Sequence, residues 1–407
     1  MRVTTNLIFD QNLRAINTSQ GELSDLQSQL ASGKRLLRPS DDPVGASQVI
    51  RLTEDLEKTN QYERNIDMAK SNLELQETSL RSITDVINRA RVLTVQSGNG
   101  IFSQPDREAV AAEIDQIRNQ VIDLMNTQNA SGDYIFSGYQ SQKQAFAFNP
   151  ANKAEPIKFQ GDDGTNRIQI SDSVSIQTTS SGKSVFENVN GRLNFDLVTN
   201  NGASLGAYGI RNQGSFDSFH ERNYDPVNAV NNQYSFTITA ANLVTISNVG
   251  TGNVEATLPY DPAEQMNFNG FEFELNGNVG DSLTVELKRP EKTNLAESLH
   301  KMSAALNDPN ISSQAFSSVI DDTLVGIDNG LAQIARENSS IGARLNIAES
   351  IRNSLLDSEV TNQEARSAIQ DVDYAQASSD FARQETALEA AFASFPRIAN
   401  LSLFNYI

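Results

Sequence analysis

The chain has 407 residues, enough for two or three domains, and its 51 acidic against 32 basic side chains give a net charge of -19. A field of that sign repels nucleic-acid backbones and anionic lipid, and no basic patch offsets it, so we expect neither kind of partner. There is no cysteine, and the two histidines, His220 and His300, lie too far apart for a metal-binding motif. We therefore expect no catalytic residue, no metal site and no cofactor.

The termini carry no sign of membrane targeting. No run of 18 apolar residues occurs, so no helix is expected to span a bilayer. The first six residues lack the basic and then apolar stretch of a cleavable signal peptide. If the protein leaves the cell, we expect it to do so by another route.

The N-terminal third predicts three helices. The first lies within about residues 5–37, with Gly33 as its C-cap. The second is predicted from about 43 to 97, after a stop and restart at Pro39 to Pro43. The third begins near Pro105, where Ser103 and Asp106 resemble a capping box, and should pack antiparallel on the second.

A seven-residue apolar repeat occurs near both ends of the chain. Its members are Ile66, Leu73, Leu80 and Ile87 in the N-terminal third, and Ile320, Ile327, Ile334 and Ile341 in the C-terminal third. A stripe this narrow and long needs another helix along its whole length. The simplest partner is the other end of the same chain, so these eight residues are predicted to form the core of a rod. Packing between molecules remains the alternative.

At Gly132 the periodicity changes from that of helices to that of strands. Strands are predicted at residues 134–136, 157–159, 167–170, 234–239, 243–246, 271–275 and 283–287. The fold class predicted is therefore α+β: a long antiparallel helical or coiled-coil rod formed by both chain ends, with a β-rich domain inserted in the middle.

Three helices are predicted after the strands. A short helix is capped by Thr293 or Asn294, a long one runs from about 314 to 358, and a last one begins at about 362. The end of the chain is unusually apolar for a terminus and needs cover from the rod, from neighbouring copies or from an escort protein. Pro396 predicts a kink or a helix end at about Phe395.

Five segments follow from these patterns. They are an N-terminal assembly helix (1–40), the N-terminal half of the rod with β-hairpins (41–180), a β-rich outer domain (181–290), the C-terminal half of the rod (291–360) and a C-terminal assembly helix (361–407).

Several motifs resemble those of the bacterial flagellin family, which includes filament subunits and their junction proteins. They are Gln29 to Arg35 with Pro39 to Ala46, Ile341 to Asn346, Gly132 to Tyr139, and a tail that includes Asp371 to Ala375 and Leu401 to Phe404. The hairpin and the tail are more similar to the junction branch than to flagellin.

The resemblance implies a non-enzymatic structural protein, exported unfolded through the flagellar type III apparatus with a cytoplasmic export chaperone. It implies assembly outside the cell with copies of itself, as a ring or helical zone between hook-associated protein 1 and the flagellin filament. The residues expected at this assembly interface are Leu13, Ile16, Leu23, Leu26, Leu30, Phe381, Leu388, Phe392, Phe395, Leu403 and Phe404. The alternatives are a flagellin itself, or a glycan-binding adhesin or glycosidase in the β insertion.

Overall fold

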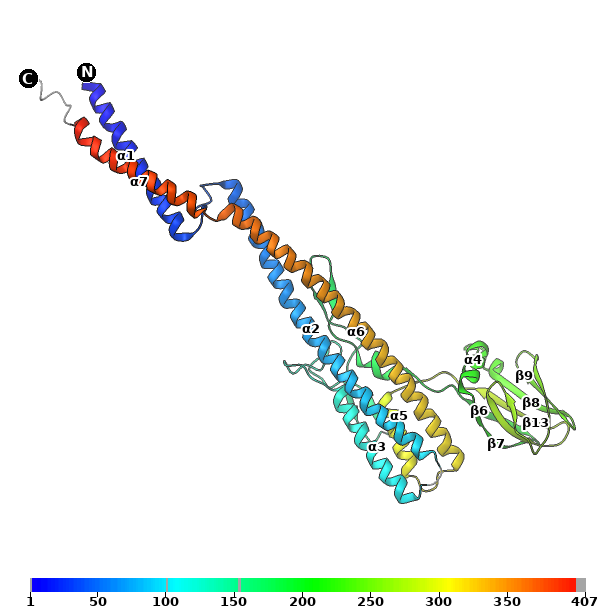
Figure 1. Ribbon diagram of the computed structural model, residues 1–407. Coiled ribbons are helices and arrows are strands. Elements are labelled where there is room, and N and C mark those ends of the chain that lie inside the picture. The colour runs from blue at the N-terminus through cyan, green and yellow to red at the C-terminus, as the bar shows by residue number, and fades with distance from the viewer. Residues whose placement is uncertain (1, 100–101, 153–154, 400–407) are drawn as a thin grey trace, which may run out of the picture. The chain divides into compact units, whose positions relative to one another are not determined.

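The computed structural model describes residues 2–99, 102–152 and 155–399, and for residues 2–6, 8–9 and 395–399 it describes the backbone alone. The chain divides into two compact units, whose elements are labelled in Figure 1. The first unit combines Met1–Met68, Gln169–Ser175 and Ile347–Ile407, and the second combines Ala69–Ile168 and Ile176–Asn346.

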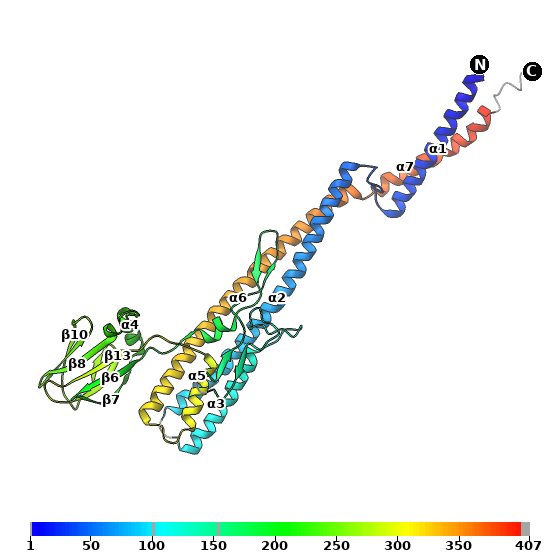
Figure 2. The ribbon, with the colours of Figure 1, turned by 180° about the vertical axis from the view of Figure 1, so that it is seen from behind.

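Helices from the two chain ends pair in the first unit. Helix α1 (Arg2–Ser32) and helix α7 (Tyr374–Ala399) lie side by side, as both views show (Figures 1 and 2). Gln384 on α7 donates to the Glu22 carboxylate on α1 at 2.6 Å. Helix α1 ends where Gly33 takes a φ of 71°, and the Gly33 N–H donates to the Gln29 carbonyl, which confirms the predicted C-cap.

The long helices are α2 (Pro43–Ser97) and α6 (Ser313–Gln370), and they run antiparallel. In the first unit Arg352 on α6 pairs with Asp67 on α2. In the second unit Arg91 on α2 pairs with Asp328 on α6 at 2.8 Å. Both chain ends thus contribute one long helix each, and the predicted fold class is confirmed.

The break between α6 and α7 lies further along the chain than the sequence predicted. Helix α6 continues to Gln370, not 358, and α7 begins at Tyr374, not 362. The Asp373 carboxylate caps α7 by accepting from the N–H groups of Ala375 and Gln376. The Val372 N–H, just before that cap, donates to the Gly33 carbonyl.

Pro396 does not end helix α7. A kink or a helix end was predicted at about Phe395. The helix continues to Ala399, so the helix end is wrong, and the kink stays a prediction. Proline removes one backbone hydrogen bond, and this costs most in a helix interior. Here only three helical residues follow it, so little of the helix depends on the lost bond.

Helix α3 (Gln104–Met125) packs antiparallel on α2, as predicted. The Ser79 hydroxyl donates to the Leu124 carbonyl at 2.9 Å, and Arg89 pairs with Glu113 at 2.7 Å. At the start of α3, the carboxylate of Asp106 accepts from the backbone N–H and the hydroxyl of Ser103.

Helix α5 (Leu295–Asn307) lies against α6 at a point where α6 carries glycines. A Cβ added at Gly326 would lie 2.7 Å from Ser298 Oγ, and one at Gly330 would lie 2.6 Å from Leu295 Cδ1. Since Leu295 is fully buried, the two helices can approach this closely only because these positions lack side chains. The cap of α5 is Asn294, whose side chain accepts from the Ala296 N–H.

Short hairpins follow α3. Strand β1 (Phe146–Phe148) pairs with β2 (Ile157–Phe159), and β3 (Arg167–Gln169) pairs with β4 (Ser175–Gln177). The strand predicted at 134–136 is wrong, because this segment forms turns with a single bridge between Gln128 and Tyr134. Its apolar side chains, Ile135 and Phe136, are nonetheless buried.

The β insertion is built from two sheets. A π-helical turn (Lys183–Glu187) and strand β5 (Val189–Asn190) precede it, β14 (Lys292–Thr293) follows it, and β5 pairs with β14. The first sheet has the order β10-β9-β8-β13-β6 and the second the order β11-β12-β7. The bounds are β6 Phe195–Asn201, β7 Ser204–Ile210, helix α4 Gln213–Asn223, a 3-10 turn Ala229–Asn232, β8 Gln233–Ala240, β9 Leu243–Asn248, β10 Val254–Pro259, β11 Met266–Phe268, β12 Phe271–Asn276 and β13 Ser282–Leu287.

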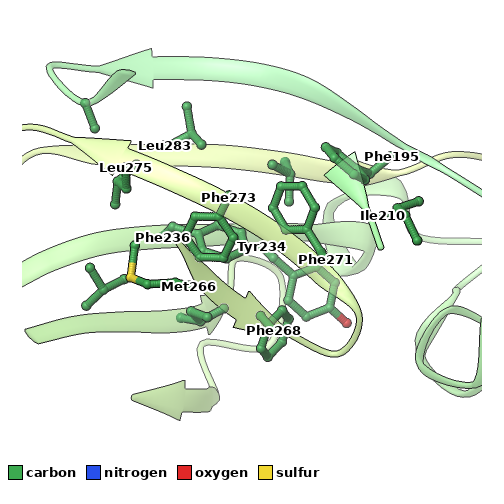
Figure 3. Close-up of a cluster of buried hydrophobic side chains, with 14 of the residues drawn as sticks. Phe195, Ile210, Tyr234, Phe236, Met266, Phe268, Phe271, Phe273, Leu275 and Leu283 are labelled. Atoms are coloured by element: carbon green, nitrogen blue, oxygen red, sulfur yellow. The ribbon is translucent and has the colours of Figure 1, made fainter. Parts of the chain in front are cut away.

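Aromatic side chains from both sheets meet in the core of the insertion (Figure 3). Phe236 on β8 contacts Phe273 on β12 edge to face, with ring centroids 4.9 Å apart. Phe195 on β6 meets Phe271 on β12 in the same way at 4.1 Å. The insertion therefore has its own hydrophobic core.

Candidate assembly interface

The eight residues predicted for the rod core are all buried. Ile66, Leu73, Leu80, Ile87, Ile320, Ile327, Ile334 and Ile341 have exposed fractions between 0% and 8%. These values are those of a closed helix–helix core. No neighbouring molecule is needed to cover this part of the apolar repeat.

A buried polar layer interrupts this core. Gln76, three residues after Leu73, is fully buried and donates its side-chain amide to the Thr178 carbonyl at 2.6 Å. Close along the chain, Ser180 donates to the Glu337 carboxylate on α6, also at 2.6 Å. The segment before the β insertion is therefore fastened to both long helices, and such polar groups favour one register over its neighbours.

The pair α1–α7 differs from the rod because it leaves much of its apolar surface uncovered. Ile16 on α1 and Ala377 on α7 are buried, with exposed fractions of 8% and 4%. Leu13 and Phe392 are exposed, at 38% and 53%. The other predicted interface residues with described side chains are half-buried: Leu23, Leu26, Leu30, Phe381 and Leu388.

Three predicted interface residues cannot be placed in the same way. Phe395 lies in α7, but its side chain is outside the described part, and Leu403 and Phe404 lie outside the described residues altogether. Sequence reasoning missed Ala377 on α7, which is buried. A small alanine side chain does not stand out in a pattern of large apolar residues, although its place in the first turn of α7 could have indicated close packing.

The connection between α1 and α2 donates hydrogen bonds to the last carbonyls of α6. The Arg35 N–H donates to the Gln370 carbonyl at 2.7 Å, and its guanidinium donates to the Ile369 carbonyl at 2.7 Å. The last carbonyls of a helix have no partner within the helix and carry a partial negative charge. Arg35 therefore satisfies the end of α6, within the stretch of sequence that resembles the flagellin signature.

The described residues do not gather into a metal-binding cluster. They contain no group of three or more histidine, aspartate or glutamate side chains that could hold a metal ion. None of the helices in the described ranges is long and apolar enough to cross a membrane. His220 Nε2 lies 2.7 Å from the Lys288 carbonyl, and His300 contacts Arg118, so both histidines have structural contacts.

A surface groove of about 490 Å³ lies on the β insertion, beside Asp196, Asp225 and Lys288. Two of its charged side chains, Asp225 and Lys288, have partners within the insertion. The Asp225 carboxylate accepts from the N–H groups of Asn228 and Val227 and from the Asn231 amide, and these bonds lower the pKa of Asp225. Lys288 pairs with Asp196 at 2.9 Å. These contacts give the glycan-binding alternative no support.

Comparison with known proteins adds two family matches. Residues 3–141 match the bacterial flagellin N-terminal helical region, and residues 324–407 match the bacterial flagellin C-terminal helical region. The first match covers α1, α2 and α3, and the second covers α7 and most of α6. The β insertion lies between the two matched regions.

Individual relatives distinguish the branches of the family. Flagellar hook-associated protein 3 of Escherichia coli is 25% identical over 408 residues, which cover 99% of this chain and 99% of that protein. A flagellin of Listeria monocytogenes is 28% identical over 37% of this chain and 54% of its own length. The solved structure of the flagellar junction protein FlgL from Legionella pneumophila has a TM-score of 0.57 at 24% identity, covering 79% of this chain and 100% of that one. The chain therefore belongs to the bacterial flagellin family, as a homologue of flagellar hook-associated protein 3.

Proposed function

We propose that this chain assembles, through α1 and α7, as the zone between hook-associated protein 1 and the flagellin filament. It is a non-enzymatic structural component of the extracellular flagellum at the hook–filament junction.

The observation that carries the proposal is the contrast between the two helix pairs. The predicted rod-core residues are buried within the chain, whereas most predicted residues of α1 and α7 keep part of their apolar surface in water. Each side chain of this size contributes about 1.5–3 kcal/mol when it is fully buried. Neighbouring subunits would supply that burial, so the pair is suited to folding further on assembly.

Repetition of one such contact would link many copies. A head-to-tail contact between different surfaces of identical chains generates rings or helical arrays. The same partly exposed surface supports the proposal that a cytoplasmic chaperone covers the terminal segments before export, because contiguous apolar patches otherwise promote aggregation. Hook-associated protein 1 and flagellin would present matching terminal helices at the two faces of the zone.

Deleting the gene tests the junction role against the flagellin alternative. A cell without the junction protein should keep its hooks, lack attached filaments and release polymerisable flagellin into the medium. Intact filaments on the deletion strain would contradict the proposal. Re-expression of the parent chain is the control, and it should restore attached filaments.

A further inference from the structure

The β insertion is joined to the helices of the second unit by a narrow neck. Strand β5 leads into it and β14 leads out, and each contains two residues. Beyond this pair, the Gly191 N–H donates to the Glu291 carbonyl and the Lys288 N–H donates to the Asn194 carbonyl, both at 2.9 Å. A two-stranded ribbon of this size has little stability of its own. By itself, the neck would let the insertion turn relative to α6.

One arginine in the neck contacts both sides of this connection. The Arg192 Nε donates to the Gln213 side chain at the start of α4, at 2.7 Å. On α6, its guanidinium pairs with Asp322 at 3.2 Å and with Asp321 at 3.3 Å. The Arg192 side chain is only 5% exposed.

The surroundings favour this one orientation of Arg192. Gln213 is held in turn, because its amide donates to the Leu193 carbonyl at 3.0 Å and to the Asp217 carboxylate at 2.7 Å. A guanidinium is planar with donors in fixed directions, so it matches several acceptors in a single geometry. A buried cation that loses its acceptors is costly, and this cost opposes any motion that separates α4 from the two aspartates.

A second contact joins the insertion to α6. The Gln314 side chain, near the start of α6, donates to the Tyr208 carbonyl on strand β7 at 3.4 Å. This long, exposed hydrogen bond is much weaker than the charged contacts of Arg192. Resistance of the neck to turning therefore depends chiefly on Arg192.

We propose that Arg192 is a clamp that fixes the orientation of the β insertion on helix α6 by bridging Gln213 with Asp321 and Asp322. The clamp is a conformational device of this chain, independent of which flagellar proteins the terminal helices contact. It holds the insertion at one angle, so that every copy in an assembly presents the same outer surface.

The absence of cysteine from the chain makes the test direct. Val254→Cys on the insertion and Ala335→Cys on α6, both exposed positions, accept a pair of spin labels on the full chain. Pulsed electron spin resonance then measures the distribution of distances between them. The parent should give one narrow distribution. Asp321→Ala with Asp322→Ala should give a width about twice as large, because only the two-stranded neck and the weak Gln314–Tyr208 hydrogen bond then resist turning.

Two further variants keep the result interpretable. Arg192→Met removes the clamp from the other side and should broaden the distribution as the aspartate pair does. Arg222→Met removes an exposed arginine of α4 that donates to the Ser218 carbonyl, and it should keep the narrow distribution. Circular dichroism confirms that each variant retains its helices. A parental width in the aspartate variant would overturn the proposal.

Discussion

At the scale of single residues, both histidines occupy sites that disfavour their charged form. Burial is the main cause that lowers the pKa of His220, and the hydrogen bond to the Lys288 carbonyl only partly opposes it. Burial also lowers the pKa of His300, and the neighbouring Arg118 guanidinium lowers it further. In the unfolded chain both histidines return to their ordinary pKa near 6.5.

These directions give the sign of a pH dependence. Below the unfolded pKa, the unfolded chain binds protons that the folded chain still excludes, so the free energy of unfolding falls as the pH decreases. We expect the parent to lose stability between pH ~7 and ~5, and the variant His220→Gln with His300→Gln to lose less over the same range. Urea unfolding at several pH values measures the difference. Carboxylates away from the two histidines titrate alike in both proteins, so parallel curves would contradict this account.

Substitution of two glycines on α6 tests how closely α5 packs against α6. A Cβ at Gly342 meets nothing within 4 Å, so Gly342→Ala should raise the free energy of unfolding by up to ~1 kcal/mol through helix propensity. A Cβ at Gly330 meets the buried side chain of Leu295, so Gly330→Ala should instead lower it by ~1–3 kcal/mol through overpacking. Thermal or urea unfolding of the two variants measures these changes. An equal rise in the free energy of unfolding for both would show that α5 can move away from α6 without loss of stability.

At the scale of elements, the sequence predicted best those boundaries that are set locally. Helix α2 begins at Pro43 and ends at Ser97, as expected from the Pro-rich restart and the Gly that follows. The start of α3 was also predicted correctly, because Ser103 and Asp106, which form its cap, are close in sequence. The end of α6 was not, because contacts with Gly33 and Arg35, far away in the chain, accompany the break.

Within the β insertion, the strands that alternate clearly were found and the irregular ones were missed. Strand β8 alternates between buried and less buried residues, whereas β6 buries Phe195 alone and leaves its other residues exposed. An edge strand with few buried neighbours lacks the two-residue period that marks a strand. For the candidate site, sequence indicated which residues are apolar. The sequence could not show that the predicted interface residues are partly exposed, because their exposure depends on which helices are present to cover them.

The uneven burial of the helices predicts uneven protection against hydrogen exchange. In the purified monomer, amides before about residue 30 and after about residue 375 should exchange fast, since α1 and α7 bury few side chains against each other. Amides of α2 near Leu73 and Leu80 should exchange slowly because they surround fully buried side chains. Mass spectrometry of peptides from a time course measures both classes. Strong protection of α1 in the monomer would refute folding on assembly.

At the scale of the whole molecule, truncation of Phe392 should weaken assembly while leaving the free energy of unfolding of the single chain almost unchanged. Its side chain is exposed in the single chain, so Phe392→Ala should change the free energy of unfolding by no more than ~0.5 kcal/mol. The matched control is Val227→Ala, which truncates an even more exposed side chain on the β insertion. Both variants should therefore unfold like the parent in urea, and both can be expressed in the deletion strain.

The variants Phe392→Ala and Val227→Ala should differ in how well they assemble. If a neighbouring subunit covers Phe392, which is 53% exposed in the single chain, truncation removes at most about 1.5–3 kcal/mol from each contact, which corresponds to at most roughly a 10- to 100-fold weaker association of each subunit. Cells that carry Phe392→Ala should then shed flagellin into the medium and keep fewer attached filaments, while Val227→Ala cells should keep the parental number. Filament counts and flagellin in the medium measure the effect. Parental counts with Phe392→Ala would mean that the exposed face of α7 is not the contact surface, and the assignment of α1 and α7 to neighbouring subunits would then fail at this position.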